Sequence, residues 1–176
     1  MSISITINDT DVRKAFAGMS ALVNNQRKMM ADVGDGMVSR VSRGFDKATS
    51  PYGVKWKPLS KAAKLGRLRN NKSNFKKSGR LSKRGRGSVK SGFQPLSSTG
   101  ALKRSITRKA YKNSVEIGTD SDYAATHQFG RKITSKMFKG ATIPARPFLP
   151  SNGLPKAWKD EMLDTMKEHM KKAMHG

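Results

Sequence analysis

The N-terminal part of the chain shows two hydrophobic patterns in succession. Three isoleucines between Ile3 and Ile7 alternate with Ser and Thr, which is the period of a half-buried β-strand. From about Val12 to Lys47 apolar residues recur at steps of three and four, which predicts one stripe on a long helix. Gly34 and Gly36 each weaken a helix by about 1 kcal/mol relative to Ala, but the stripe keeps its phase across them. We therefore predict one helix rather than two, partly packed against another subunit. The stripe comprises Phe16, Met19, Val23, Met30, Val33, Met37, Val41 and Phe45.

The patterns after residue 100 predict hairpins and a short helix. Residues 105–109 and 114–118 read as two strands joined by a turn, and a second hairpin-like stretch covers Ile133 to Ile143. Between them a helical turn through Tyr123 to His127 ends at Gly130. Asp120, Ser121 and Asp122 are expected to cap its start.

The C-terminal end of the chain predicts an extended strap followed by a helix. Residues 144–150 contain three prolines, which fix φ and remove N–H donors, so this stretch must be extended. A helix begins after Pro155 and should pack through one apolar stripe. The stripe comprises Trp158, Met162, Met166, Met170 and Ala173.

The middle of the chain has a different character. Residues 60–95 mix Gly, Ser, Asn, Lys and Arg and show no sustained hydrophobic period. We expect a basic, extended insertion, a mobile loop or arm that orders on binding. With 176 residues, of which 35% are hydrophobic, we predict a single α+β domain of residues 1–176 that carries this insertion. The modest apolar content favours oligomerisation.

The positive charge is confined to one segment. The net charge is +24, from 36 Lys and Arg against 12 Asp and Glu. Between Lys47 and Val115 lie 20 basic residues and no acidic one, which leaves a net of +4 for the rest. Such a segment suits contacts to phosphates that ignore base sequence, and contact with an acidic protein or a solvated tail remains an equal alternative. The candidate contact residues are Lys64, Arg67, Arg69, Lys72, Lys76, Lys77, Arg80, Lys83, Arg84 and Arg86.

The residues give no positive sign of catalysis, of a cofactor or of a metal site. The chain has no cysteine, and its three histidines lack metal-ligand spacing. The close pairs Asp32 with Asp35 and Asp120 with Asp122 read as helix charge or caps rather than as catalytic carboxylates. No apolar run reaches the roughly 20 residues of a membrane span, and the start lacks a signal-peptide pattern. We therefore expect a non-enzymatic protein of the reducing cytoplasm without membrane contact.

Four strings in this order resemble the phage virion morphogenesis family of tail-completion proteins. They are Phe45 with the run from Ser50 to Leu59; the run from Ser98 to Ile106; Val115 to Thr119 followed by Tyr123 to Gly130; and Ile143 to Leu149. Each string is weak by itself, but the ordered set is specific and covers about residues 45–149.

The resemblance implies an α+β structural protein of a tailed phage that completes the tail or joins head to tail at the neck. It implies a ring-forming homo-oligomer, a hexamer, around the DNA passage, in contact with other neck and tail proteins and with DNA possible in the channel. The protein would reside in the virion and in the host cytoplasm during assembly. The candidate interface residues are Trp56, Phe129, Arg146 and Phe148.

Two of these residues have alternative roles. For Arg146, on the stiff strap, we favour an intersubunit ion pair over a phosphate contact. For Trp56 we favour a core or interface anchor over base stacking. The competing hypothesis for the whole protein is a non-structural nucleic-acid-binding protein without sequence specificity, and a third is a nuclease that uses Asp120 or Asp122.

Overall fold

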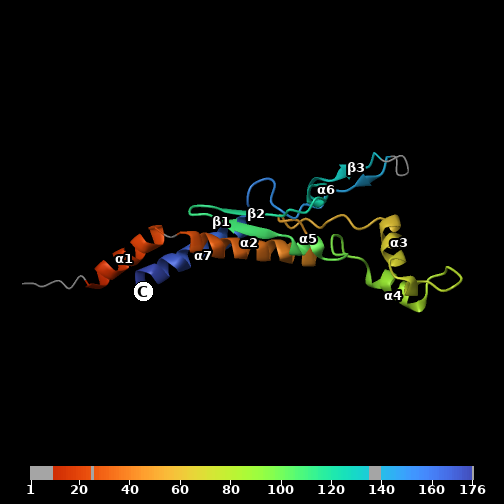
Figure 1. Cartoon of the computed structure of the whole chain (residues 1–176), viewed down its shortest axis with the longest axis horizontal. Coiled ribbons are helices and arrows are strands. Elements are labelled where there is room, and N and C mark those ends of the chain that lie inside the picture. Colours follow the sequence, from red (N-terminus) through yellow and green to blue (C-terminus); the bar gives the residue numbers. More distant parts are fainter. Residues whose placement is uncertain (1–9, 25, 135–139, 176) are drawn as a thin grey trace, which may run out of the picture. The chain divides into compact units, whose positions relative to one another are not determined.

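The computed structural model describes residues 10–24, 26–134 and 140–175. The chain forms two compact units, of which the first comprises residues 1–39, 108–117 and 154–176 and the second comprises residues 40–107 and 118–153. Figure 1 shows helices together with short strands, so the predicted α+β class is confirmed. The predicted strand between Ile3 and Ile7 lies outside the described residues.

The long N-terminal helix is present but interrupted once. It forms α1 (Thr10–Asn24) and α2 (Arg27–Lys47), with Gln26 in a turn between them, so the prediction of one continuous helix is wrong at this point. The interruption lies between Asn24 and Arg27 and not at Gly34 or Gly36, which both lie inside α2. Asparagine side chains compete for backbone hydrogen bonds and favour helix ends.

The first unit is built around the N-terminal half of α2. Met30, Val33 and Met37 of α2 are buried there, as is Trp158 of α7 (Lys156–His175). Helices α1 and α7 lie side by side (Figure 1), and they approach so closely that a Cβ on Gly18 would lie 1.6 Å from the carbonyl oxygen of Ala173. The predicted C-terminal helix therefore packs through the side that carries Trp158.

The first hairpin crosses α2 at a glycine. It consists of β1 (Thr107–Ala110) and β2 (Val115–Gly118), as predicted, and the amide of Tyr111 bonds to the carbonyl oxygen of Ser114 across the turn. A Cβ on Gly34 would lie 2.5 Å from Cδ of Arg108 and 2.7 Å from Cγ2 of Val115. Gly34 therefore has a packing role that its cost to the helix does not reveal.

The second unit contains the aromatic core. Phe45 is fully buried, and its ring centroid lies 5.4 Å from that of Trp56 and 5.5 Å from that of Phe148. Leu102 of α5 (Ala101–Arg104) and Ile106 are buried in the same unit. Aromatic pairs at this spacing add about 0.5–1.5 kcal/mol beyond the area they bury.

The remaining elements of the second unit follow the predicted order. Helix α6 (Ala124–Phe129) is followed by β3 (Arg131–Lys132), which pairs antiparallel with β4 (Thr142–Ile143) in the register Arg131 with Ile143. The predicted side-chain cap of α6 is wrong, because its first turn is closed by the backbone bond from the amide of Ala124 to the carbonyl oxygen of Ser121. Asp120 and Asp122 are exposed instead.

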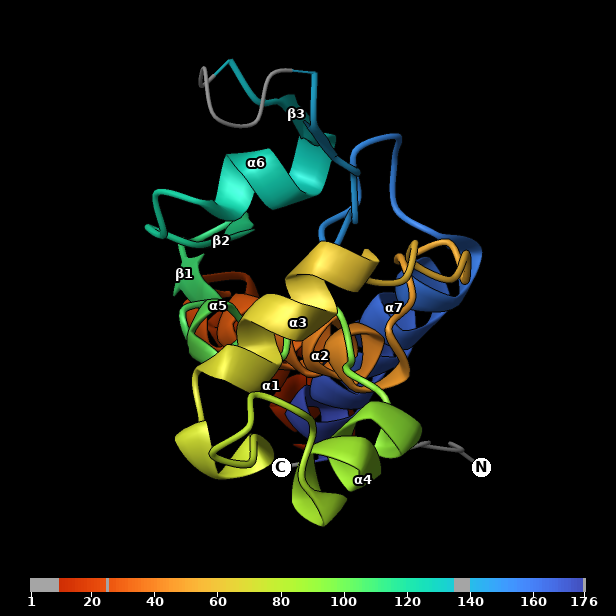
Figure 2. The ribbon, with the colours of Figure 1, turned by 90° about the vertical axis from the view of Figure 1, so that its right-hand side faces the viewer.

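Regular structure also occupies the basic segment. It contains α3 (Lys61–Arg69), the 3-10 helix η1 (Lys72–Asn74) and α4 (Lys83–Ser91), and α3 and α4 lie side by side (Figure 2). The expectation of a loop without regular elements is therefore wrong. These helices are too short to display a hydrophobic period, and capping side chains start each of them. The caps are Ser60, Asn71 and Ser82.

Candidate functional site

We call residues 60–92 the basic lobe. A few buried groups hold it together: Leu68 is 3% exposed and Asn74 is 6% exposed, and Nδ2 of Asn74 donates to the carbonyl oxygen of Leu68 over 3.0 Å. The amide of Ser82 donates to the carbonyl oxygen of Asn74 over 2.9 Å. Helix α4 approaches this carbonyl so closely that a Cβ on Gly85 would lie 2.2 Å from it. The lobe therefore depends on polar bonds and one close backbone approach rather than on a large core.

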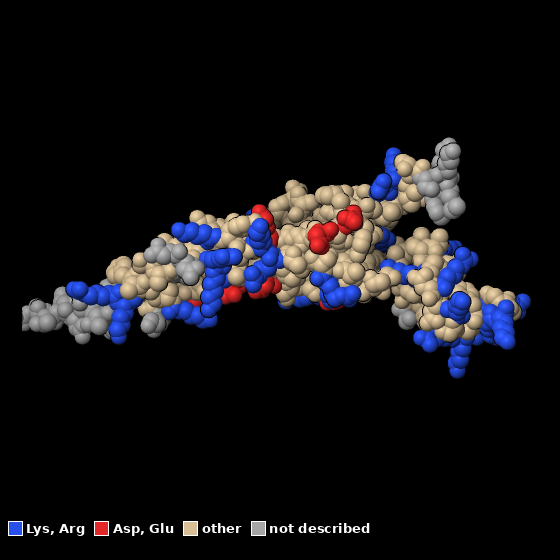
Figure 3. All heavy atoms as spheres, viewed as in Figure 1, with Lys and Arg blue, Asp and Glu red and all other residues tan. Residues whose placement is uncertain are grey.

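The lobe presents its cations to solvent. Figure 3 shows Lys and Arg side chains over this part of the chain without an acidic neighbour, in agreement with the absence of Asp and Glu from residues 60–92. Among the candidate contact residues only Lys64 and Arg67 are half-buried. The exposed ones are Arg69, Lys72, Lys76, Lys77, Arg80, Lys83, Arg84 and Arg86.

Two cations of the lobe also have internal bonds. Nη1 of Arg67 donates to the carbonyl oxygen of Gln94 over 2.8 Å, and Nη1 of Arg86 donates to that of Leu81 over 3.2 Å. Burial lowers the pKa of Arg67. Arg67 is therefore part of the second unit's structure as well as a charge on the lobe.

Cations of the lobe lie at both ends of its two α-helices. The first turns of α3 and α4 contain no acidic residue, and they carry Lys61, Lys64, Lys83 and Arg84. Cations near a helix N-terminus oppose the positive end of the helix dipole. These four first-turn cations therefore do not stabilise their helices through the dipole, whereas Arg67, Arg69 and Lys90 lie in the last turns of α3 and α4, where a cation does.

The aromatic side chains of this region expose little surface for stacking on bases. Trp56 is 7% exposed, and its Nε1 donates to the carbonyl oxygen of Pro147 over 2.8 Å. Phe75 and Phe93 are half-buried. Any nucleic-acid contact by the lobe would therefore be to the phosphate backbone.

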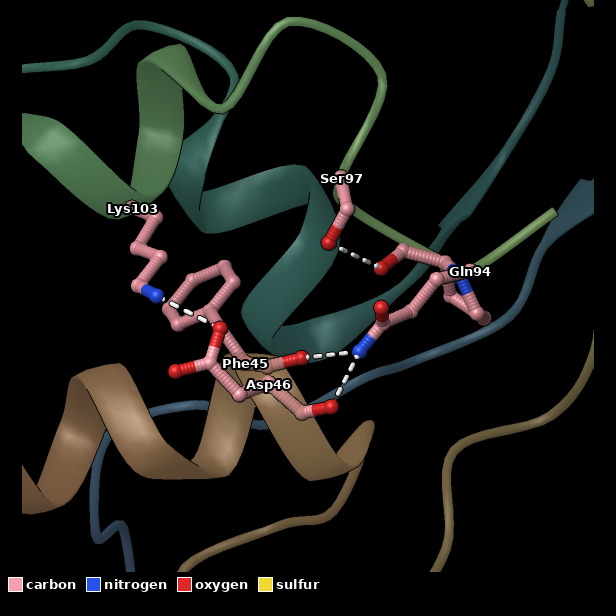
Figure 4. A network of polar contacts seen from close by, with 6 residues as sticks. Phe45, Asp46, Gln94, Ser97 and Lys103 are labelled. Atoms are coloured by element: carbon pink, nitrogen blue, oxygen red, sulfur yellow. Dashed lines mark hydrogen bonds and ion pairs between the residues drawn. The ribbon is translucent and has the colours of Figure 1, made fainter.

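The chain that follows the lobe is bound to the C-terminal end of α2. In Figure 4 the Nε2 atom of Gln94 bonds to two helix-end carbonyl oxygens, that of Phe45 at 2.5 Å and that of Asp46 at 2.7 Å, while Oγ of Ser97 faces the neighbouring Pro95. Nζ of Lys103 lies 2.6 Å from Oδ1 of Asp46. Carbonyl groups in the last turn of a helix lack intrahelical partners, and Gln94 satisfies two of them. The sequence did not single out Gln94.

Gln128 of the third string forms hydrogen bonds with the backbone of the fourth string, residues 143–149. Gln128 is 7% exposed, and its Oε1 accepts from the amides of Phe148 at 3.0 Å and Leu149 at 3.1 Å, while its Nε2 donates to the carbonyl oxygen of Leu149 at 2.8 Å. The buried side-chain amide of Gln128 thus fixes the strap of residues 144–150 to α6. Tyr52 fixes the end of the strap, because its hydroxyl accepts from the amide of Asn152 and donates to the carbonyl oxygen of Gly153, both at 2.8 Å.

Arg146 has hydrogen-bond partners within its own chain. It is 4% exposed, and it donates from Nε to the carbonyl oxygen of Lys57 at 2.9 Å and from Nη2 to that of Pro58 at 3.2 Å. These bonds join the strap to the first string, and the intersubunit ion pair predicted for Arg146 stays a prediction. Sequence alone could not identify carbonyl partners that lie almost ninety residues away.

Of the four candidate interface residues, the structure exposes one. Trp56, Arg146 and Phe148 lie together in the second unit and are buried within their own chain, whereas Phe129 is 71% exposed. Phe129 lines an open groove of about 1160 Å³ together with residues of β3 and β4. An interface role for this side chain stays a prediction.

The described residues show no grouping that would hold a metal ion, since no three His, Cys, Asp or Glu side chains converge there. In the same ranges none of the helices has the length and apolarity to span a membrane. Asp120 and Asp122, the carboxylates of the nuclease hypothesis, are both exposed.

Comparison with known proteins identifies the family. The sequence model of the phage virion morphogenesis family matches residues 7–89 and 82–171, which together cover nearly the whole chain. This chain belongs to the phage virion morphogenesis family. The resemblance based on the four strings is thereby confirmed. The two matched stretches of this virion morphogenesis protein meet at α4, inside the basic lobe.

One curated relative gives a similar answer. Mu-like prophage FluMu G protein 2 of Haemophilus influenzae is 46% identical over 55 residues, which are 31% of this virion morphogenesis protein and 38% of the relative. The match therefore spans well under half of the relative's length. No solved structure matches the chain significantly.

Proposed function

We propose that this protein completes the tail or joins head to tail at the neck of a tailed phage, as a ring-forming homo-oligomer, a hexamer, around the DNA passage. Its basic lobe faces the DNA, and it acts by binding rather than by catalysis. Membership of the phage virion morphogenesis family supports the general role. The neck position and the hexameric state are part of the proposal and are motivated by the sequence resemblance.

The observation that carries self-association is the exposed apolar stripe of α1. Phe16 is 68% exposed and Val23 is 59% exposed, although both belong to the stripe that continues into the core of α2. Exposed apolar side chains at helical spacing on one face suit a second protein surface. Helix α7 adds Leu163 and Met170, which are 48% and 45% exposed.

Native mass spectrometry of the purified protein tests the ring. We expect a closed oligomer of six copies, which Phe16→Lys combined with Val23→Lys dissociates because the charges would be buried at the interface. Ala21→Lys is the matched control, since Ala21 is exposed on the opposite side of α1. A wild-type protein that stays monomeric at all concentrations contradicts the proposal.

The DNA contact is supported by the exposed cations of the lobe and by the lack of an acidic residue among them. Fluorescence anisotropy with duplexes of unrelated sequence measures it. The variant Lys76→Gln, Lys77→Gln, Lys83→Gln removes three exposed lobe cations, and the control Lys156→Gln, Lys159→Gln, Lys172→Gln removes three from α7.

We expect weaker binding by the lobe variant and a salt slope that is smaller by roughly 0.9 for each phosphate that the variant no longer neutralises. The α7 variant should retain the wild-type slope. Equal effects of both variants would mean that net charge alone causes the binding.

The second candidate, a non-structural nucleic-acid-binding protein, is favoured by the same lobe. The two functions differ in where the protein is found. We expect it in purified virions by peptide mass spectrometry; finding it in infected cells but not in virions would favour the second candidate.

A further inference from the structure

A cavity of about 180 Å³ lies in the second unit, between α3, α6 and the strap. Three lining side chains are basic: the guanidinium groups of Arg67 of α3 and Arg146 of the strap, and the imidazole of His127 of α6. No lining residue of this cavity in the described chain is an aspartate or a glutamate. Two guanidinium groups therefore share one small space without a counter-charge in its wall.

The backbone fixes two of the three groups next to each other. The amide of Arg146 donates to the carbonyl oxygen of His127 over 2.7 Å. The ring of Tyr123, one helical turn before His127, packs edge-on against the imidazole with centroids 6.0 Å apart. The positions of these side chains are thus set by the fold and not by mutual attraction.

Both arginines have N–H donors without a partner among the described residues. Arg146 uses Nε and Nη2 for the carbonyl oxygens of Lys57 and Pro58, and Arg67 uses Nη1 for that of Gln94. A guanidinium carries five N–H donors, so both residues have donors to spare. Nδ1 of His127 is buried and has no hydrogen-bond partner among the described residues. Buried polar atoms without partners are rare in folded proteins.

Electrostatics also favours an anion in this cavity. Burial lowers the pKa of Arg146, and the charge of Arg67 lowers it further. Burial also lowers the pKa of His127, and here the charge of Arg146 adds to the effect. A bound anion would relieve this repulsion between like charges.

The shape of the site favours a carboxylate over a DNA phosphate. The apolar part of the wall comes from Leu59, Leu96, Ala101 and Leu102 and suits the methylene groups of an acidic side chain. The phosphates of a duplex belong to a broad, stiff rod that cannot enter a concave space of this size. Guanidinium groups also bind carboxylates with two parallel hydrogen bonds.

We propose that this cavity binds one carboxylate, carried on an acidic side chain of a neighbouring polypeptide in the assembled particle. Arg67 and Arg146 form the ion pair, and the imidazole of His127 lies in the cavity wall beside them. The assignment of the carboxylate to a neighbouring polypeptide depends on the proposed structural role, whereas the carboxylate site itself does not. Because bound carboxylate favours the charged imidazole, binding strengthens as the pH falls toward the pKa of His127, with Arg67, Arg146 and Tyr123 facing the ring.

The probe is N-acetyl-glutamate amide, which has one free carboxylate, and its neutral isostere N-acetyl-glutamine amide is the control. Binding is measured in the full chain by nuclear magnetic resonance, from the chemical shifts of the imidazole carbons. We expect a saturable shift of the His127 signals with the first compound, no shift with the second, and unchanged signals for His169. Arg67→Gln should weaken binding about tenfold or more, because a charge-assisted bond is removed.

Arg69→Gln is the matched control, since Arg69 is exposed on the same helix and does not line the cavity. A second variant does not remove any structural bond: Ser98→Glu places a carboxylate at the cavity from within the chain. It should raise the melting temperature and abolish probe binding, whereas Ser97→Glu, one residue away, should do neither.

Three results would each overturn the proposal. The first is a shift that is absent or does not saturate, and the second is an equal effect of Arg67→Gln and Arg69→Gln. The third is tighter binding of inorganic phosphate or of a short duplex DNA at His127. The native mass spectrum separates this result from the role in the particle. A protein that binds the probe but never assembles keeps the site and loses the proposed function, and one that assembles without binding the probe does the reverse.

Discussion

The indole Nε1 of Trp56 donates a 2.8 Å hydrogen bond to the carbonyl oxygen of Pro147, 91 residues further along the chain. This bond joins the first string of the family pattern to the proline strap. The carbonyl oxygens of Lys57 and Pro58 receive the guanidinium of Arg146 right beside it. The first and fourth strings, which are separate in sequence, are therefore joined within the second unit.

Replacing Trp56 by phenylalanine tests this bond. Trp56→Phe keeps an aromatic ring against Phe45 but leaves the carbonyl oxygen of the half-buried Pro147 without its donor and opens a small cavity. We expect the free energy of unfolding to fall by about 1–3 kcal/mol. Urea titration measures it, and Tyr111→Phe, which removes an exposed hydroxyl in the first unit, should change it by less than about 0.5 kcal/mol.

The two glycines in the middle of α2 should respond oppositely to alanine. Gly34→Ala inserts a Cβ 2.5 Å from Cδ of Arg108 and 2.7 Å from Cγ2 of Val115, so we expect a loss of about 1–3 kcal/mol by overpacking. Gly36→Ala finds its nearest neighbour, a carboxylate oxygen of Glu161, at 3.6 Å and should stabilise the helix by about 0.5–1 kcal/mol. Thermal unfolding of both variants gives the sign, and a stabilising Gly34→Ala would contradict the packing of the hairpin on α2.

The glycines of α4 provide the same comparison inside the basic lobe. Gly85→Ala places a Cβ 2.2 Å from the carbonyl oxygen of Asn74, a backbone atom that cannot move aside without disturbing η1. Gly87→Ala meets no atom within 4 Å. We expect Gly85→Ala to open the lobe locally and Gly87→Ala to leave it closed or more stable.

The rate of tryptic cleavage measures this difference, because trypsin cleaves after Lys and Arg and the lobe is rich in both. Cleavage within residues 60–92 should become at least several-fold faster in Gly85→Ala than in Gly87→Ala. Equal rates would mean that the lobe is already open in the native protein.

Acidification should weaken the contact between α2 and the first hairpin. Oδ1 and Oδ2 of Asp35 accept from Nε and Nη2 of Arg108 at 2.6 and 2.8 Å, and this hydrogen bonding lowers the pKa of Asp35. A carboxyl whose folded-state pKa lies below its unfolded value of about 3.9 stabilises the protein above that value. The stabilisation is lost as the pH falls through the folded-state pKa.

Urea titrations between pH 6 and pH 3 check this effect. Asp35→Asn should be less stable than the wild type at pH 6, and the difference should shrink toward pH 3. In an Arg108→Gln background the substitution should have little effect at either pH, since the partner is already absent. A difference that grows on acidification would have the wrong sign for this pair.

The elements and the distribution of charge could be predicted from the order of the amino acids. Periods of two and of three to four residues located the first hairpin and the N- and C-terminal helices, because a half-buried strand or helix must repeat its apolar positions at its own period. The count of acidic residues located the basic lobe. The ordered strings indicated the family.

Which groups meet could be learned only from the folded chain. The donors and acceptors that bind Gln94, Gln128 and Arg146 are backbone atoms, which every residue possesses, so no residue type in the sequence marks the partner. The close approaches at Gly34 and Gly85 likewise depend on segments that are distant or that lack a period. Folding also brings Arg67, His127 and Arg146 together around one cavity, although these residues are far apart in the sequence.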